Sequence, residues 1–413
     1  MTIANHRVPL RVPTAASTFA LGIAGYLGVN LSPYMIEALS STLGLDVLAS
    51  SWLVTATLLL TAVTGLLVAP LCAGPHRRLI ARIGGLVGFI GFISAALTPE
   101  LIIPGLLIGG IGAGGSVAVS GSALAAFRNP DRTAALNGVA NRGVITIVLA
   151  VVPLIGLAPL EVFGALALFS LIGLLLAGML PAAPVEMSRT GAAVGEAVPL
   201  EISPTGAVST VAHGSGSPAV RIAGFTLLVL FTLWAASEDS LYAMAGVVGG
   251  DQAGLTAEGL GIALSCATGG GLLGTIGLLV VGNRLGRAYP LAILVIMGGV
   301  LKIALGLVTD DTAFILLFTL WNTVYAIAFM YFVATSAALD SSGRWSGPLL
   351  AAYLVGSALT PVIGAALISV FGHAGFTLTL GIASFIIAVP TFIVGRLSTR
   401  WERTADATEA VRA

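Results

Sequence analysis

The chain has 413 residues, of which 57% are hydrophobic and only 9% are charged. A soluble domain carries about 25% charged residues, so this composition excludes an ordinary soluble protein. The formal net charge is zero, which gives no reason to expect a nucleic acid as partner. The only lysine, Lys302, lies between Leu301 and Ile303 rather than in a Gly-Lys-Ser/Thr loop, so we expect no phosphate-binding ATPase site.

Twelve apolar segments follow one another along the chain. Their apolar runs reach about twenty residues, which favours membrane-spanning helices over the alternating ten-residue strands of an outer-membrane barrel. The sequence therefore predicts an all-α polytopic membrane protein with twelve transmembrane helices. We place them at 15–36, 48–72, 79–98, 101–127, 136–158, 159–180, 222–248, 256–281, 289–309, 312–338, 347–371 and 374–396.

The charges between the spans predict the topology. With a cytoplasmic N-terminus, 16 of the 18 basic residues lie on the cytoplasmic side, and two, Arg142 and Lys302, lie within spans. The outer loops then contain no Lys or Arg. Their charged residues are all acidic: Glu37, Asp46, Glu100, Glu161, Asp251, Glu258, Asp310 and Asp311. This positive-inside pattern predicts both termini inside and a multi-pass protein of a bacterial plasma (inner) membrane.

One hydrophilic segment divides the chain. Residues 182–220 are rich in Gly, Ser, Pro and Ala and contain no long apolar run, which is typical of a flexible linker. We therefore predict an N-terminal six-helix bundle at 1–181, a cytoplasmic linker at 182–220, a C-terminal six-helix bundle at 221–397 and a cytoplasmic tail at 398–413.

The two halves match each other at a shift of 208 residues. Matching pairs occur in several well-separated spans: Ser32 with Ser240, Tyr34 with Tyr242, Gly91 with Gly299, Pro153 with Pro361, Gly156 with Gly364 and Gly173 with Gly381. Six spans in each half insert both halves in the same orientation, so we expect a parallel repeat about an axis along the membrane normal.

Several of these features resemble the major facilitator superfamily. The loop after the second span of the C-terminal half reads Gly282-Asn283-Arg284-Leu285-Gly286-Arg287, similar to that family's Asp-Arg-x-Gly-Arg gating loop, with Asn283 in place of Asp. The loop Gly74-Pro75-His76-Arg77-Arg78 is its basic counterpart in the other half, and 110–115 resembles the glycines of the family's fourth helix. The resemblance implies two pseudo-symmetric six-helix bundles, with Asn283, Arg284 and Arg287 in a gating loop.

The resemblance also implies a function. Members of this family are secondary active transporters, which move a small solute by alternating access and need no ATPase site. We expect proton coupling, and the segment Pro153-Leu154-Ile155-Gly156 resembles part of an antiporter signature, which points to efflux of a drug or metabolite. Two alternatives stay open: a proton symporter or uniporter for a small organic anion, and a non-transporting membrane sensor or scaffold.

Arg142 is the first charge that needs a reason to lie inside a span. It is roughly 12 Å from the cytoplasmic end of span five, and Asn137 and Asn141 flank it on the same helix. Arginine does not lose its proton in a protein, so it must pair with an acid, carbonyls, water or an anionic substrate. We predict a substrate-binding role for all three residues; a structural pair or a side chain reaching the cytoplasmic surface is the alternative.

Glu238 and Asp239 lie next to each other in the outer half of span seven. Two adjacent carboxylates in a low dielectric repel each other, so one of them is suited to take up and release a proton. We predict that they serve proton coupling or gating. If span seven ended early, they would face outside water instead.

Lys302 in span nine receives a different interpretation. We expect its long side chain to reach the outer surface or to pair with Asp310 or Asp311, because ninth helices are peripheral in the resembled family.

The resemblance further implies that spans one, four, seven and ten line a central cavity. Their aromatic and polar residues suit a partly apolar organic solute, and we predict that these bind substrate: Asn30, Tyr34, Trp234, Trp321, Asn322 and Tyr325. Packing is the alternative for Tyr34. No histidine lies inside a span, and Cys72 and Cys266 have no metal-site spacing, so we expect no metal, cofactor or enzyme activity and a monomer in the lipid bilayer.

Overall fold

The computed structural model describes residues 8–72, 74–124, 126–128, 130–181, 218–281, 286–339 and 346–412, and its described part is helical apart from short connections. The chain forms two compact units, Met1–Ile202 and Ser203–Ala413. Almost all of the predicted linker, 182–217, lies outside the described residues, whereas its last three residues already belong to a helix that begins at Pro218.

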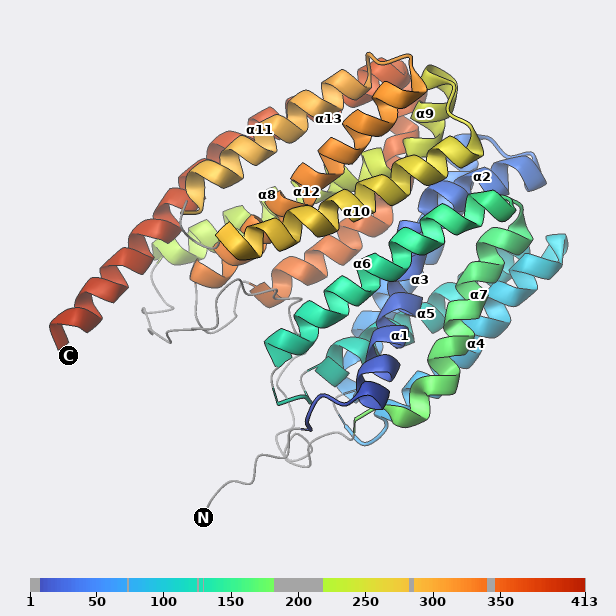
Figure 1. Cartoon of the computed structure of the whole chain (residues 1–413), viewed down its shortest axis with the longest axis horizontal. Helices are drawn as coiled ribbons and strands as arrows, with labels where there is room; N and C mark the ends of the chain where they lie inside the picture. The colour runs from blue at the N-terminus through green and yellow to red at the C-terminus, as the bar shows by residue number, and fades with distance from the viewer. Residues whose placement is uncertain are drawn as a thin grey trace. The chain divides into compact units, whose positions relative to one another are not determined.

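The first unit contains seven α-helices and two short 3-10 turns in its described part (Figure 1). The α-helices are α1 (Val12–Asn30), α2 (Ser32–Leu43), α3 (Val47–Cys72), α4 (Arg77–Leu97), α5 (Ile102–Leu124), α6 (Pro130–Ile155) and α7 (Pro159–Leu176), with η1 at Pro99–Leu101 and η2 at Ala177–Met179. The helix α4 packs along α5 and α7, α3 packs along α5, and α1 packs on α5, α6 and α7. The predicted first span is divided at Leu31, two residues before Pro33.

The second unit repeats this plan. Its helices are α8 (Pro218–Ala243), α9 (Ala245–Ala253), α10 (Ala257–Val281), α11 (Ala288–Leu305), α12 (Asp311–Leu339) and α13 (Ser346–Arg412). The helix α8 packs on α13, α10 on α12, and α11 on both α12 and α13. The residues of the predicted tail continue α13 as far as Arg412.

Eleven helices of the described part are long and apolar enough to cross a membrane. The last of these stretches, Tyr353–Thr399, has 47 residues, which at 1.5 Å per residue is about 70 Å, more than twice the roughly 30 Å of a bilayer core. It is broken at Gly372, where φ is 67° and ψ is 179°, a conformation that favours glycine. The stretch therefore holds two spans, and the prediction of twelve is confirmed.

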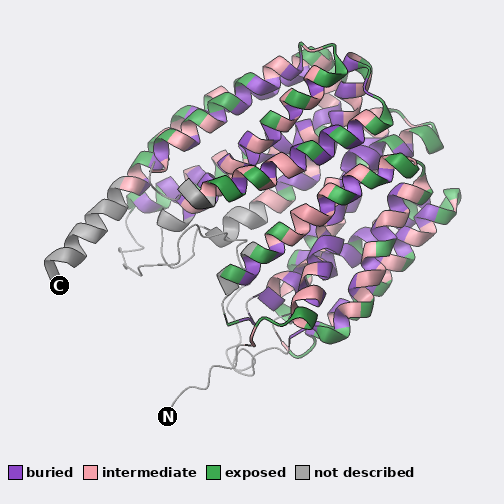
Figure 2. Cartoon of the chain, viewed as in Figure 1, coloured by how far each residue is buried: buried purple, intermediate pink, exposed green. Residues whose placement is uncertain are grey.

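The apolar face of α4 shows how the outside of the first unit meets lipid. Its exposed large side chains are spaced by one or two helical turns and so lie on one face: Leu79, Ile83, Leu86, Ile90 and Leu97. The glycines of the same helix are buried. Figure 2 shows that buried and exposed residues recur along the long helices of the chain. Such a surface is stable in hydrocarbon and not in water.

Glycines in α5 bring helix backbones into contact. A Cβ atom added to Gly110 would lie 2.5 Å from the carbonyl oxygen of Thr57 on α3. At the same contact the hydroxyl of Thr61 donates a hydrogen bond to the carbonyl of Gly110, at 3.0 Å. Small residues that permit such close approach replace the hydrophobic driving force that lipid does not supply.

The constant 208-residue shift between the halves is wrong at the fifth span of each half. The ends of α4 and α11, Leu97 and Leu305, do differ by 208 residues, but α6 begins at Pro130 and α13 at Ser346, which is 216 residues later. Gly156 follows the end of α6, whereas Gly364 lies inside α13, whose break is at Gly372. The match of 153–156 with 361–364 is therefore a coincidence of composition. Most of the extra eight residues lie in α12, which has 29 residues where its counterpart α5 has 23.

Candidate functional site

The helix α8 carries the two acids near its C-terminal end, five and four residues before its last residue, Ala243. Glu238 is 1% exposed and Asp239 is 8% exposed, so neither faces open water in this structure. Successive residues on a helix point about 100° apart, and the two carboxylates therefore meet different neighbours.

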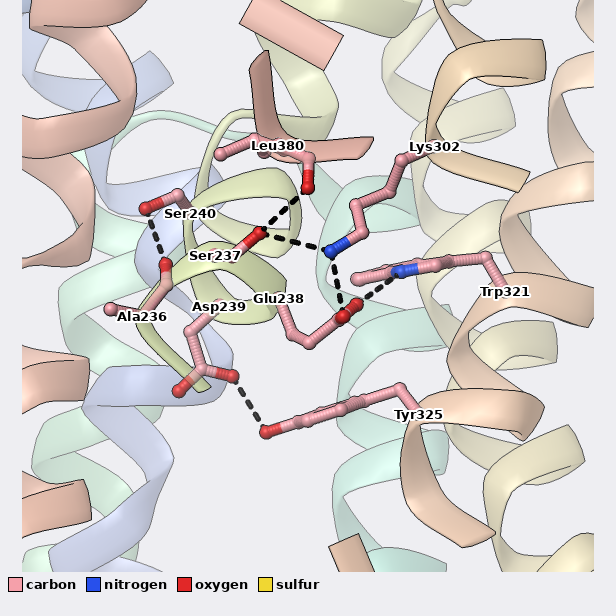
Figure 3. A network of polar contacts seen from close by, with 9 residues as sticks. All are labelled: Ala236, Ser237, Glu238, Asp239, Ser240, Lys302, Trp321, Tyr325 and Leu380. Atoms are coloured by element: carbon pink, nitrogen blue, oxygen red, sulfur yellow. Dashed lines mark hydrogen bonds and ion pairs between the residues drawn. The ribbon is translucent and has the colours of Figure 1, made fainter. Parts of the chain in front are cut away.

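Glu238 is held by two donors (Figure 3). The ammonium Nζ of Lys302 on α11 lies 2.6 Å from Oε1, and the indole Nε1 of Trp321 on α12 donates to Oε2 at 2.6 Å. Lys302 also donates to the hydroxyl of Ser237 at 2.9 Å, and that hydroxyl lies 3.4 Å from the carbonyl oxygen of Leu380 on α13. The network thus joins four helices of the second unit.

The expectation for Lys302 is wrong. Its side chain is 0% exposed and pairs with Glu238, not with the acids of the next loop. Asp310 and Asp311 instead accept hydrogen bonds from backbone N–H groups at the start of α12. Lys302 lies in the last turn of α11, where the negative end of the helix dipole favours a cation, and the buried carboxylate supplies the countercharge that a buried ammonium needs.

Asp239 has a different environment. The hydroxyl of Tyr325 on α12 donates to Oδ1 at 2.7 Å and lies 3.5 Å from the hydroxyl of Tyr353 on α13. The other oxygen, Oδ2, accepts no hydrogen bond of good geometry in the described part of the chain, although the hydroxyls of Ser357 and Tyr353 are near enough to stabilise its charge. The charged group that interacts electrostatically with Asp239 is its neighbour Glu238. Among the described residues, no cation pairs with Asp239.

Aromatic residues predicted to bind substrate lie around the two acids. The rings of Trp321 and Tyr325 are stacked, with centroids 6.1 Å apart, and the ring of Trp234 lies 5.3 Å from that of Tyr325. All three are buried, as is Asn322, and the indole Nε1 of Trp234 has no hydrogen-bond partner among the described residues. The structure therefore brings three of the predicted residues together with both acids, whereas sequence reasoning did not connect them.

The predicted residues of α6 form a second polar group, in the first unit. Asn137 is 3% exposed and lies near Gly22 of α1 and Ser120 of α5, and Arg142 is partly exposed five residues further along α6. The Oδ1 atoms of Asn137 and Asn141 are buried without a hydrogen-bond partner, and no acid pairs with Arg142 within the described part.

Asn30 and Tyr34 use their polar atoms inside the first unit. The amide of Asn30 donates to the carbonyl of Tyr26 at 2.9 Å. Tyr34 is 0% exposed and its hydroxyl donates to the carbonyl of Leu149 on α6 at 2.7 Å. These contacts favour the packing alternative for Tyr34.

The predicted gating loop falls largely outside the described residues. This applies to Asn283 and Arg284, whereas Arg287 directly precedes α11. In the first unit, sequence reasoning missed the role of Arg77, which is 1% exposed. Its guanidinium donates to the carbonyls of Cys72, Ser122 and Pro181 at 2.9, 3.1 and 3.3 Å.

The signal that would have found Lys302 is present in the sequence: a lone lysine within a span, since intramembrane charges are functional or paired by default. Tyr353 has no comparable signal, because a single tyrosine near a span end is typical of an interface. Among the described residues, no three His, Cys, Asp or Glu side chains are grouped to hold a metal ion.

No protein-family model matches the chain, and no curated protein matches its sequence. Solved structures do match its fold. A D-xylose–proton symporter has a TM-score of 0.70 at 16% identity, covering 92% of this chain and 96% of the symporter. A POT family transporter in complex with 5-aminolevulinic acid has a TM-score of 0.70 at 13% identity, over 93% of this chain and 96% of that one.

A nucleoside transporter gives a TM-score of 0.68 at 15% identity, covering 93% of this chain and 99% of the transporter. These neighbours are transporters rather than enzymes, and identities this low establish the fold alone. The chain is therefore a multi-pass membrane protein with the twelve-helix major facilitator fold.

Proposed function

We propose that this protein is a secondary active transporter that moves a small organic solute by alternating access, coupled to protons, in the manner of a drug or metabolite efflux antiporter. The observation that carries the proposal is the buried pair of acids on α8, Glu238 and Asp239, surrounded by aromatic side chains. Carboxylates inside a membrane protein are costly and mark ion pathways by default. The proton symporter among the structural neighbours supports the coupling ion.

The cellular setting follows from the charge pattern. With the basic loops inside, both termini are cytoplasmic and the protein lies in a bacterial plasma membrane as a monomer. The aromatic residues Trp234, Trp321 and Tyr325, with Asn322, contribute to substrate binding in the second unit. Asn283, Arg284 and Arg287 form the gating loop of that unit.

The test begins with a ligand screen. Purified protein is heated with cationic drugs, organic acids, sugars and nucleosides, because a ligand that binds the folded state raises its apparent stability. The solute that stabilises the protein is then used in sealed vesicles with an imposed pH gradient.

The decisive variant is the double amide Glu238→Gln/Asp239→Asn, the first prediction. It should abolish pH-gradient-driven flux, because neither amide takes up a proton. The same variant with Lys302→Met added, which leaves no buried ammonium unpaired, should show the same loss in a folded protein. Glu258→Gln, which changes an exposed acid in the first turn of α10, is the matched control and should transport normally. Unchanged driven flux in the double amide would exclude the coupling role.

A second candidate function is symport or uniport of a small organic anion. The observation that favours it is Arg142, a guanidinium without an acidic partner in the described part, beside the unpartnered oxygens of Asn137 and Asn141. A planar guanidinium binds a carboxylate through two parallel hydrogen bonds. In this alternative Arg142 is the anion clamp, and Arg142→Ala should lose binding of an anionic solute.

A further inference from the structure

We propose that the two adjacent acids divide the work: Asp239 alone exchanges the coupling proton, by way of Tyr325 and Tyr353, while Glu238 remains a fixed anion held by Lys302 and Trp321. This inference rests on the proposed function and assigns separate roles within it. It depends on which atoms each carboxylate meets.

The two donors hold Glu238 in its charged form. Its Oε1 faces the ammonium of Lys302 and its Oε2 faces the indole N–H of Trp321, both at 2.6 Å. Ammonium and indole groups donate hydrogen bonds and do not accept them. A proton on Glu238 would therefore weaken both of these hydrogen bonds, and it would leave a fully buried ammonium without its countercharge.

Asp239 is suited to both protonation states. Its one well-formed hydrogen bond comes from the hydroxyl of Tyr325, and its Oδ2 accepts no hydrogen bond of good geometry within the described chain. A hydroxyl both donates and accepts, so Tyr325 can donate to the carboxylate and, after rotation, accept from the acid. Asp239 and Tyr325 therefore stay hydrogen-bonded to each other whether or not Asp239 carries a proton.

The hydroxyls also form a path away from Asp239. The Tyr325 hydroxyl lies 3.5 Å from that of Tyr353, which is partly exposed and sits seven residues after Ser346, at the end of α13 predicted to be cytoplasmic. In the transfer, Tyr325 passes its proton to Asp239 and takes one from Tyr353, and Tyr353 takes one from a hydronium ion, which leaves as water. One proton moves from hydronium to the carboxylate, and both tyrosines end neutral.

The titratable and polar groups near Asp239 come from α8, α12 and α13. On α8 the charged neighbour is Glu238, on α12 the group is Tyr325, and on α13 the groups are Tyr353 and Ser357. The cation of α11, Lys302, is bound to Glu238 and Ser237.

The test is infrared titration of the full chain in lipid vesicles, which needs no solute. The C=O stretch of a protonated carboxylic acid appears as pH falls, and difference spectra against each variant assign it. The band of a buried acid should be lost in Asp239→Asn. It should persist in Glu238→Gln/Lys302→Met, which removes both members of the ion pair and so leaves no buried charge unpaired.

Tyr325→Phe sharpens the assignment. Loss of its hydroxyl should shift the frequency of the Asp239 band and slow its appearance after a pH jump, whereas the exposed-acid control Glu258→Gln should change neither. A buried-acid band that survives Asp239→Asn, or that disappears in Glu238→Gln/Lys302→Met while that variant elutes as a folded protein, would overturn the division of roles.

The two proposals fail separately. If Asp239 titrates as described but the vesicles show no proton-driven flux, the transport function is wrong and the assignment stands. If flux is proton-driven but the titrating band belongs to Glu238, the function stands and the assignment is wrong.

Discussion

Each of the two units buries a cation, and they satisfy it in different ways. In the second unit Lys302 pairs with Glu238, so charge meets charge across α11 and α8. In the first unit Arg77 meets three backbone carbonyls from the ends of α3 and α5 and from Pro181 after α7, with no acid among its hydrogen-bond partners. A planar guanidinium can serve several carbonyls at once, whereas a compact ammonium needs a concentrated countercharge.

Arg142 provides the third case. Within the described residues, its guanidinium has neither an acidic partner, as Lys302 has, nor carbonyl partners, as Arg77 has. Cations with internal partners therefore hold helices together, whereas a cation such as Arg142, with no acidic partner among the described residues, is available for a partner from outside the protein.

The largest expected effect is that of Lys302→Met. It leaves Glu238 as a buried, unpaired carboxylate, and we expect the free energy of unfolding to fall by about 3–5 kcal/mol, the usual cost of breaking a buried pair. Thermal and denaturant unfolding in detergent measure it. Glu238→Gln/Lys302→Met should lose much less; equal losses would show that the pair contributes packing rather than charge.

Next comes Arg77→Ala, which removes three charge-assisted hydrogen bonds at the ends of helices. We expect a loss of roughly 1.5–3 kcal/mol or more in unfolding free energy. The conservative Arg77→Lys should recover only part of it, because an ammonium cannot reach three diverging carbonyls equally well. Full recovery by lysine would contradict the geometric argument, and melting temperatures of the three proteins decide it.

Arg142→Ala should change stability by no more than about 0.5 kcal/mol, because its guanidinium has no acidic partner among the residues that the structure describes. Its effect should appear in binding. The thermal shift caused by an anionic solute should disappear, while the shift caused by a cationic drug should persist or increase. Normal binding of an anionic solute by Arg142→Ala would exclude the anion-clamp role of Arg142.

The smallest effect is expected from deleting residues 186–215 of the predicted linker. Transport and melting temperature should stay close to those of the full chain, because a Gly-, Ser- and Pro-rich segment adds little packing. Loss of folded protein would show that this segment is structural, and intact folding with loss of a binding partner in cells would favour the sensor or scaffold alternative.

Parts of the site were predictable because burial of charge in a membrane has a general cost. Glu238, Asp239 and Arg142 stand out in apolar spans for that reason alone. Lys302 carried the same signal, but the family's peripheral ninth helix suggested an exposed side chain, which is wrong here. The contacts of Tyr353 and Arg77 were not predictable, because each depends on which helix lies opposite.

The repeat shows the same limit in another form. Composition-driven matches placed Gly364 opposite Gly156, and the helix breaks place Gly372 there instead. In a chain with 53 glycines, identity at a position carries little information about equivalence, whereas the break in a helix does.

By itself, the sequence determined that this protein lies in a membrane, crosses it twelve times and carries a few charges inside it, because the transfer of each segment into hydrocarbon depends mainly on its own residues. The tertiary structure alone decided which of those charges meet. Lys302 and Glu238 are 64 residues apart in the chain and 2.6 Å apart in space. Such a contact depends on how helices pack against one another, and apolar segments of similar composition do not specify their neighbours.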